Sequence, residues 1–240
     1  MDTQVPLVVP EVNVHDLENH KGIVSIPNCS TTPLVMILKP LSKISRIKRV
    51  VVDTFQSVTG TGTAALTEMQ TQSSQVLEGE TVQPEQYPHQ IAFNVLPHIE
   101  PFQENGYTRE EMKMLHETRK ILHDPEVLVS ATCVRVPVAV SHSEAIHIEF
   151  ENEVKVDDAI EKLDNFPGIK ILDDLNNNIY PTPLDSAGKD DVFVGRVRAD
   201  NYRSNILVLW VVTDNLRTVS YTHLRAHETE ADLVCRLLLE

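Results

Sequence analysis

The sequence has few cysteines and few positively charged side chains, and both shortages limit what the protein can do. Only three of its 240 residues are cysteines, namely Cys29, Cys133 and Cys235. They are too few and too scattered for a disulfide framework or a zinc site, so we expect a reducing compartment, the cytoplasm. Lysine and arginine number 21 against 35 acidic residues, which gives a net charge of −14. Since no basic run offsets this charge, nucleic acid and anionic membranes are not expected as partners.

Long apolar segments are also lacking. The nearly continuous apolar run from Ile206 to Val212 is about a third of the ~20 residues that a bilayer requires, so it predicts a buried strand. Residues Met1 to Pro10 include the acid Asp2 and have no positive region or long apolar stretch, so no signal peptide is predicted. With 41% apolar and 23% charged residues, the chain has the composition of a soluble globular protein.

The hydrophobic pattern predicts helices and strands without a regular alternation between them. Residues Met1 to Pro27 have no helical period, and we expect an extended connector there that ends in a short strand at 22–26. Helices are predicted at about 30–41, 64–77, 108–124 and 156–163, and further strands at 49–55, 127–140, 145–150, 170–172, 192–198 and 206–212. This order favours an α+β fold with a mixed or antiparallel sheet over a doubly wound sheet.

Cys29 is the sharpest candidate for chemistry. It precedes a predicted helix that has Pro33 in its first turn, so its thiol would lie at the helix N-terminus. The helix dipole and the free backbone N–H groups there favour thiolate over thiol, which makes Cys29 a candidate nucleophile. The alternative is a buried cysteine that caps the helix.

A second candidate region surrounds Arg135. Cys133 and Arg135 alternate on a predicted strand and point to one face, where burial is the expected fate of Cys133. His142 follows Arg135 at an odd offset, so in an unbroken strand the two side chains would point to opposite faces. A shared site therefore requires a bend near Pro137 or after Val140; otherwise His142 is a surface loop histidine.

Glu110 and Lys113 are three residues apart on a predicted helix and share one face. They could grip the amino group and an anionic group of one small ligand, or form an ordinary surface ion pair. Glu111 is explained by a capping box with Thr108. Histidines elsewhere show no ligand spacing except His223 and His227, which lack the glutamate of a metalloprotease helix, so no metal site is predicted.

One glycine-rich motif is a possible false lead. Gly60, Gly62 and Ala65 form G-x-G-x-x-A between a predicted strand and helix, and Glu80 follows at roughly the distance of a ribose-binding acid. The loop is too long and too rich in threonine for a tight phosphate-binding turn, and no second βαβ unit follows. A dinucleotide-binding fingerprint is therefore the weaker interpretation.

Five segments together resemble the aspartate-semialdehyde dehydrogenases, most of all their bacterial branch. The segments are GIVSIPNCSTT (22–32), VVVDTFQSVTGTGTAA (50–65), NGYTREEMKMLHETRKILHDP (105–125), SATCVRVPVAVSHSEA (130–145), and DDVFVGRVRAD with LWVVTDNLR (190–200 and 209–217). The resemblance extends from about Val5 to Arg217. It implies NADPH-dependent reduction of β-aspartyl phosphate to aspartate semialdehyde and phosphate, on the route to lysine, methionine and threonine.

The family resemblance implies a role for each candidate residue. Cys29 would form the thioester, His142 would assist as acid and base, and Gln56 would help to hold the thioester. The residues implied to bind substrate are Arg135 for the carboxylate, Glu110 for the amino group and Lys113 for the phosphate. The residues implied to contact NADP are Thr59, Gly60 and Asn215.

The resemblance also implies how the chain is organised. Residues 1–28 correspond to a remnant of the cofactor domain and a connector, and residues 29–217 to a catalytic and dimerisation domain, like that of the aspartate-semialdehyde and glyceraldehyde-phosphate dehydrogenases. The N-terminal Rossmann domain of the family has no counterpart in this sequence, so we expect this chain to be inactive alone. Residues 218–240 do not resemble the family, and we expect an artefactual tail.

The resemblance further implies a homodimer formed through the sheet. Two alternatives remain open: a sibling N-acetylglutamyl-phosphate reductase, and a non-catalytic oligomerisation fragment. A free amino group read by Glu110 and Lys113 argues against an acetylated substrate. Ordinary alkylation kinetics at Cys29 would favour the non-catalytic fragment.

Overall fold

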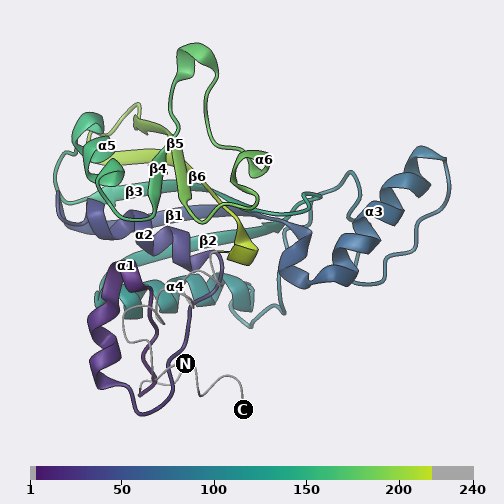
Figure 1. Ribbon diagram of the computed structural model, residues 1–240, viewed down its shortest axis with the longest axis horizontal. Helices are drawn as coiled ribbons and strands as arrows, with labels where there is room; N and C mark the ends of the chain where they lie inside the picture. The colour runs from purple at the N-terminus through teal and green to yellow at the C-terminus, as the bar shows by residue number, and fades with distance from the viewer. Residues whose placement is uncertain (1–3, 218–240) are drawn as a thin grey trace.

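The computed structural model describes residues 4–217, and their centre is a six-stranded sheet (Figure 1). Its order is β2-β1-β3-β6-β5-β4. The strands are β1 (Ile47–Gln56), β2 (Leu128–Arg135), β3 (His142–Phe150), β4 (Ile169–Ile171), β5 (Val192–Ala199) and β6 (Ile206–Thr213). The pairs β1–β2 and β4–β5 are parallel and the other pairs are antiparallel. The predicted α+β fold with a mixed sheet is therefore confirmed.

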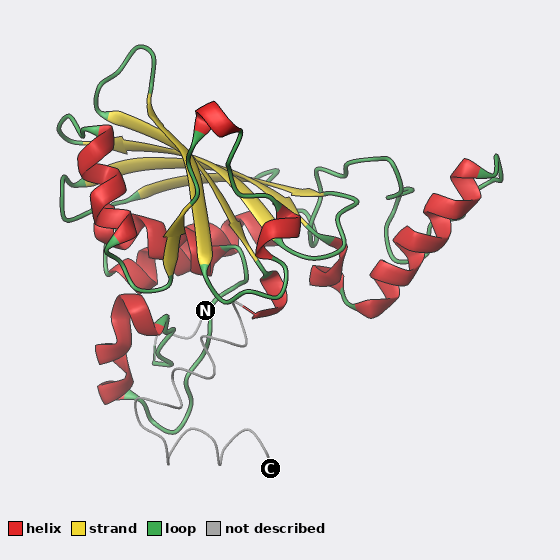
Figure 2. Cartoon of the chain, turned by 45° about the horizontal axis from the view of Figure 1, so that its top comes forward, coloured by secondary structure: helices red, strands yellow, loops and turns green. Residues whose placement is uncertain are grey.

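Helices cover one face of this sheet (Figure 2). The α-helices are α1 (Pro10–Asn13), α2 (Thr31–Leu41), α3 (Thr63–Leu77), α4 (Arg109–Leu122), α5 (Val156–Asp164) and α6 (Pro183–Ser186), and the 3₁₀ helices are η1 (Val14–Asn19), η2 (Val58–Thr61) and η3 (Leu175–Asn177). Helix α2 packs between α4 and α5 on the covered face. Helix α3 projects away from the body (Figure 1).

The hydrophobic core fills the space between the covered face and its helices. Alternate strand residues such as Val50, Val52, Ile146 and Ile148 point into it and are fully buried. All residues of α2 except Lys39 are buried, because this helix is enclosed by the sheet, its two neighbours and α1. The start of α2, which Cys29 precedes, therefore lies in the interior of the molecule.

The N-terminal segment differs from the prediction. In place of an extended connector, Pro10 begins α1, and η1 follows it directly. The predicted strand at 22–26 forms only an isolated bridge between Leu7 and Ser25. These helices are too short to produce a visible period, yet Val9 and Val12 belong to the same core as α2.

The predicted strand at 127–140 is also too long. Strand β2 ends at Arg135, and Pro137, which has no N–H to donate to a ladder, lies in the loop that follows. The loop carbonyls of Val138 and Ala139 accept hydrogen bonds from the N–H groups of Val58 and Thr59, at 2.9 and 3.3 Å. The loop before β3 is thereby fastened to the turn after β1.

Other local predictions are confirmed. The side chains of Thr108 and Glu111 form the capping box of α4, and His123 ends the helix in the left-handed conformation. The predicted helices at 30–41, 64–77 and 156–163 correspond to α2, α3 and α5. Within residues 4–217, no helix is long and apolar enough to cross a membrane. The predictions for the 218–240 tail, with Cys235, His223 and His227, lie outside the described residues.

Candidate active site

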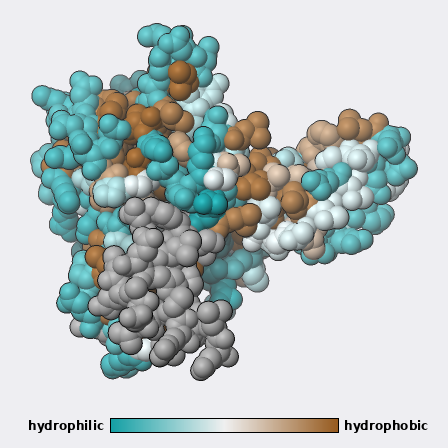
Figure 3. All heavy atoms as spheres, in the orientation of Figure 1, coloured by the Kyte–Doolittle hydropathy of each residue, from teal (hydrophilic) through white to brown (hydrophobic). Residues whose placement is uncertain are grey.

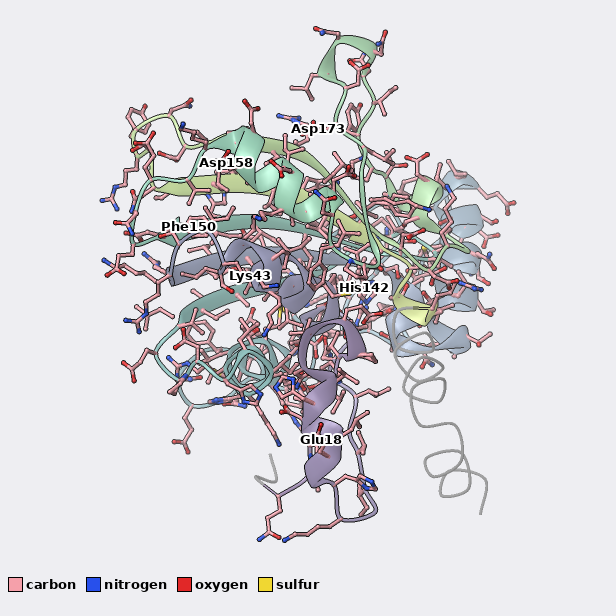
Figure 4. All side chains as sticks on the ribbon, turned by 60° about the vertical axis from the view of Figure 1, so that its left-hand side comes forward. Glu18, Lys43, His142, Phe150, Asp158 and Asp173 are labelled. Atoms are coloured by element: carbon pink, nitrogen blue, oxygen red, sulfur yellow. The ribbon has the colours of Figure 1, made fainter. Side chains whose placement is uncertain are left out.

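Three predicted site residues meet where β1, β2 and β3 come together at one end of the sheet. Gln56 ends β1 and pairs in register with Arg135, which ends β2. His142 begins β3 and lies at the opposite end of that strand from Phe150 (Figure 4). Because Arg135 and His142 occupy different strands, the loop of residues 136–141 supplies the bend that a shared site requires. All three side chains are at most 5% exposed.

Cys29 lies just before the N-cap residue Ser30 of α2 and is half-buried. Its neighbour Asn28 fixes this segment: the Asn28 side-chain oxygen accepts from the Ser30 N–H at 2.8 Å. The backbone N–H of Asn28 donates to Glu117 Oε2 at 2.9 Å. The position of the Cys29 backbone is therefore set by contacts with α4 as well as by its own helix.

Glu110 links the cysteine segment to the end of β1. Asn28 Nδ2 donates to both of its carboxylate oxygens, at 2.9 and 3.0 Å. Gln56 Nε2 donates to Oε1 at 3.1 Å. Glu110 is 3% exposed, so its charge lies inside the protein next to Cys29 and Gln56. The predicted substrate-binding helix face is thus brought to the predicted nucleophile.

Lys113 forms the outer part of the same cluster. Its Nζ lies 3.4 Å from Glu110 Oε2 and 2.6 Å from Glu100 Oε1. Burial lowers the pKa of Lys113, but the hydrogen bond to Glu100 and the charges of both carboxylates outweigh burial and raise the pKa overall. Lys113 is therefore a cation, as a phosphate-binding residue must be.

Arg135 and His142 face Gly60. A Cβ atom on Gly60 would lie 2.9 Å from Arg135 Nη1 and 3.2 Å from His142 Cε1, so the backbone of this turn contacts both side chains directly. Arg135 Nη1 donates to the Ser57 carbonyl at 2.7 Å. Arg135 Nε and His142 Nε2 are buried and have no hydrogen-bond partner among the described residues. Buried polar groups are normally paired, so these two atoms indicate a place for a bound ligand.

The pKa of Cys29 contradicts the expectation from the helix N-terminus alone. Burial, followed by the charge of Glu110, raises the pKa of this thiol to about 12, against smaller lowering effects of Arg135 and the backbone N–H. Without substrate Cys29 is therefore a thiol. The lowering of the pKa expected from the helix terminus is outweighed here, because sequence spacing does not reveal the buried carboxylate beside Cys29.

His142 is uncharged at neutral pH. Its complete burial, together with the charge of Arg135, lowers the pKa of His142 to about 3, against a smaller opposing effect of the Ser141 backbone. Its Nδ1 accepts a hydrogen bond from the Ser57 N–H at 3.0 Å. The ring is thus fixed in position as a neutral imidazole.

The three predicted cofactor contacts lie beside His142. Asn215 is 4% exposed, and its Nδ2 donates to Thr59 Oγ1 at 3.2 Å. Thr59 is half-buried and Gly60 is exposed, so this turn opens to solvent. Gly60 meets Arg135 and His142 within η2, whereas a Cβ on Gly62 would meet nothing within 4 Å and Gly62 is the N-cap residue of α3.

Sequence reasoning missed three residues of this region. Asn28 and Ser57 stand next to predicted residues, but their partners are far away in the sequence: Asn28 bonds Glu110 and Glu117, and Ser57 bonds His142. Glu144 is fully buried, and both of its carboxylate oxygens have no hydrogen-bond partner in the part of the chain that the structure describes. Burial raises the pKa of Glu144 well above its ordinary value and so favours its neutral form.

Cys133 is buried as expected and takes no part in the cluster around Cys29. Its Sγ lies 3.8 Å from Met114 Sδ in the core. Burial raises the pKa of its thiol too. Away from the site, the ligand atoms of His15, Asp16 and His123 lie within 4.8 Å of one another, but both histidines are exposed.

The comparisons with known proteins agree with this geometry. Residues 38–218 match the family model described as semialdehyde dehydrogenase, dimerisation domain. The chain belongs to this family. A curated relative, the aspartate-semialdehyde dehydrogenase of Aquifex aeolicus (strain VF5), is 50% identical over 226 residues, which cover 93% of this chain and 66% of the relative. The chain thus spans slightly less than two thirds of the length of that relative.

Solved structures show the same fold. Aspartate semialdehyde dehydrogenase II of Vibrio cholerae, described as complexed with ASA, is 39% identical with a TM-score of 0.90, over 98% of this chain and 69% of that one. A structure from Candida albicans, described as containing NADP, is 25% identical with a TM-score of 0.67, over 94% of this chain and 67% of that one. The site residues described above therefore lie in a fold that such dehydrogenases share.

Proposed function

We propose that this chain carries the acyl-transfer site of an aspartate-semialdehyde dehydrogenase, an oxidoreductase of lysine, methionine and threonine biosynthesis in the cytoplasm. The observation that carries the proposal is the convergence of Cys29, Gln56 and Glu110 beside the unpartnered nitrogens of Arg135 and His142. A thiol, a carboxylate and two buried donors at one place match the needs of an amino-acid acyl phosphate.

The substrate we propose is β-aspartyl phosphate. The planar Arg135 guanidinium can donate two parallel hydrogen bonds to the α-carboxylate. Glu110 accepts hydrogen bonds in a buried position and suits the free ammonium group, which an N-acetylated substrate lacks. Lys113 would hold the phosphate. The carboxylate at Glu110 therefore favours this substrate over N-acetylglutamyl phosphate.

In the reaction, the Cys29 sulfur forms a bond to the acyl carbon while the bond from that carbon to the phosphate oxygen breaks, and the thiol proton leaves with the phosphate as hydrogen phosphate. This gives a thioester, which is activated enough to accept hydride, and Gln56 is placed to hold it. NADPH supplies the hydride when bound. Thr59, Gly60 and Asn215, which lie beside His142, would contact the cofactor.

We further propose that two copies associate through the sheet face opposite the helices. Half-buried Phe55 and Trp210 lie on that face with their ring centroids 5.6 Å apart. A hollow of about 320 Å³ adjoins them, lined by His147, Val208 and the loop carrying Tyr180. Apolar surface of this kind is typical of interfaces between identical subunits.

The acyl-transfer half of the reaction tests the proposal without any cofactor. The full 240-residue chain is mixed with β-aspartyl phosphate, and inorganic phosphate is measured in rapid-quench samples. We expect a burst of phosphate stoichiometric with the protein. Cys29→Ala should abolish the burst and Cys133→Ala, the matched control, should retain it. No burst, or an equal burst from both variants, would contradict the assignment of Cys29.

The need for a separate cofactor-binding part is tested in the reverse direction. We expect no phosphate-dependent NADPH formation from aspartate semialdehyde and NADP by this chain alone, because hydride transfer requires the cofactor to be held against the thioester. Sustained NADPH formation would contradict this part of the proposal and leave the acyl-transfer role intact.

A further inference from the structure

Two histidines and an aspartate meet on the surface where the N-terminal segment packs against α4 (Figure 1). His15 and Asp16 lie in η1, and His123 follows the last residue of α4. One ligand atom from each of these three side chains lies within 4.8 Å of the other two. Because His123 comes 107 residues after Asp16, no local sequence pattern predicts this group.

The distances around Asp16 suit one small metal ion. Asp16 Oδ1 lies 3.0 Å from His123 Nε2 and 3.5 Å from His15 Nε2. Ligand bonds of about 2.0–2.1 Å at tetrahedral angles separate neighbouring ligand atoms by about 3.3 Å, which falls between these two values. The two imidazole rings lie side by side, with their centroids 5.7 Å apart. An ion among the three atoms therefore requires only small movements of exposed side chains.

A buried asparagine fixes the orientation of the Asp16 carboxylate. Asn13 is fully buried, and its Oδ1 accepts a hydrogen bond from the Val9 N–H at 2.9 Å, which sets the direction of its amide. Its Nδ2 donates to the Leu7 carbonyl at 2.9 Å and to Asp16 Oδ2 at 2.7 Å. Asp16 Oδ1 is thereby turned toward the two imidazoles. Metal-ligating carboxylates are commonly held in this way by hydrogen bonds from an outer residue.

The donor atoms determine which ions this group would prefer. Two imidazole nitrogens with one carboxylate oxygen suit divalent transition-metal ions such as Zn²⁺, whereas Mg²⁺ and Ca²⁺ prefer oxygen ligands throughout. Three protein ligands on the surface leave a further coordination position to water. The net charge of −14 also attracts cations to the chain.

We propose that His15, Asp16 and His123 form a Zn²⁺ site that fastens the N-terminal segment to the end of α4. This segment contributes Val9 and Val12 to the hydrophobic core, so its attachment matters to the fold. Glu110 lies at the other end of α4, about 20 Å away along the helix. The Zn²⁺ site is therefore separate from the candidate active site and from the proposed function.

Competition with a chromophoric zinc indicator measures Zn²⁺ binding by the full chain, with ZnCl₂ as the only added metal salt. His15→Ala removes one ligand at an exposed position. His123→Asn removes another and keeps a residue type that tolerates the left-handed conformation found there. Each variant should weaken binding by about 100-fold or more, since loss of even an outer hydrogen-bond partner commonly costs about 10–100-fold. An unchanged dissociation constant in either variant would overturn the proposal.

Other groups of the chain can also bind Zn²⁺, and three control variants separate them from this site. His116→Ala removes an exposed histidine from the same helix. Cys29→Ala removes the thiol of the candidate active site, and a double change of His223 and His227 to alanine removes the histidine pair of the tail. All three should retain the affinity of the unchanged chain. Loss of binding in any of them, or displacement of Zn²⁺ by Mg²⁺, would place the ion elsewhere and overturn the proposal.

Nitrogen NMR of the full chain labelled with ¹⁵N-histidine shows which rings bind the ion. Zn²⁺ should shift the ring nitrogens of two of the ten histidines, identified by the signals absent from His15→Ala and His123→Asn. The signals of His142 should stay in place. A shift of other rings in place of these two would contradict the assignment of the ligands.

Hydrogen exchange tests whether the ion fastens the two segments together. The backbone amides of residues 12–19 should exchange more slowly when the unchanged chain is saturated with Zn²⁺, and at an unchanged rate when His123→Asn is treated in the same way. Exchange that Zn²⁺ does not slow in the unchanged chain would contradict the fastening role. None of these measurements uses substrate, so a failed acyl-transfer test would overturn the proposed function alone.

Discussion

The two faces of the central sheet are built from the same strands but differ in what they carry. On the helix-covered face, Ile146 and Ile148 are buried in the core, and the same row of β3 ends in Glu144 and His142. On the opposite face, the intervening residue His147 is exposed beside a hollow. Because side chains alternate along a strand, one segment supplies residues both to the buried candidate site and to an accessible exterior.

The two faces differ in whether polar groups have shifted pKa values and in whether apolar side chains meet solvent. The covered face excludes water, so a few polar groups at its edge acquire strongly shifted pKa values, as Cys29, His142 and Glu144 do. The open face keeps apolar side chains next to solvent. Figure 3 shows further apolar side chains at the junction between the body and the projecting α3 arm.

The largest expected effect is on the free energy of unfolding, which substitutions on the two faces should lower by very different amounts. Ile148 is fully buried and its neighbour His147 points the other way. Ile148→Ala should lower the free energy of unfolding by about 2–5 kcal/mol because it leaves a cavity in the core. His147→Ala should change it by about 0.5 kcal/mol or less. Urea unfolding of both variants measures this, and equal losses would contradict the assignment of the faces.

Association should depend on the open face. Trp210→Glu places a charge on half-buried apolar surface of a chain with a net charge of −14, so we expect the dissociation constant of the dimer to rise by about 30-fold or more. Sedimentation equilibrium measures the constant. Tyr202→Glu, at a side chain that is 94% exposed in the turn before β6, is the matched control. An unchanged constant in Trp210→Glu would remove this face from the interface.

The close approach at Gly60 should affect acylation more than folding. The Cβ of Gly60→Ala would meet Arg135 Nη1 at 2.9 Å, so we expect the burst of phosphate to slow by about ten- to a hundredfold. The exposed Thr63→Ala in the same region should leave the burst unchanged. A burst of normal rate in Gly60→Ala would show that this turn does not set the position of the two site residues.

The smallest effect concerns the pH dependence of stability. Burial raises the pKa of Glu144 in the folded state. Protonated Glu144 therefore stabilises the folded state in full below the unfolded-state pKa near 4.5. This stabilisation is lost as the pH rises toward the folded-state pKa. Glu144→Gln cannot ionise, and its melting temperature should fall less than that of the unchanged chain between pH 5 and pH 9. Parallel curves would indicate that Glu144 is not held neutral.

Local signals predicted much of this fold. The capping box at Thr108 and Glu111 fixed the start of α4, and that start placed Glu110 and Lys113 on one helix face. Short elements such as α1 escaped because four residues hardly exceed one turn and produce no period. The end of β2 was misplaced because β-branched residues continue past Pro137, while the sheet hydrogen bonds do not.

The candidate site was predictable by residue type more than by chemical state. Sequence motifs and spacing indicated Cys29, Arg135 and His142 as site residues. Their protonation depends on contacts between distant segments, such as that of Asn28 with Glu110, 82 residues apart, which no local pattern contains. The helix N-terminus suggested a thiolate at Cys29, and burial beside Glu110 reverses that expectation.

The most direct test of Cys29 as the nucleophile is to locate the acyl group after reaction with β-aspartyl phosphate. The chain is quenched in acid, which preserves thioesters, then digested and examined by tandem mass spectrometry. We predict one aspartyl group on the peptide containing Cys29 and none on the peptide containing Cys133. An acyl group on Cys133, or on no cysteine while phosphate is released, would contradict the proposed acyl-transfer site.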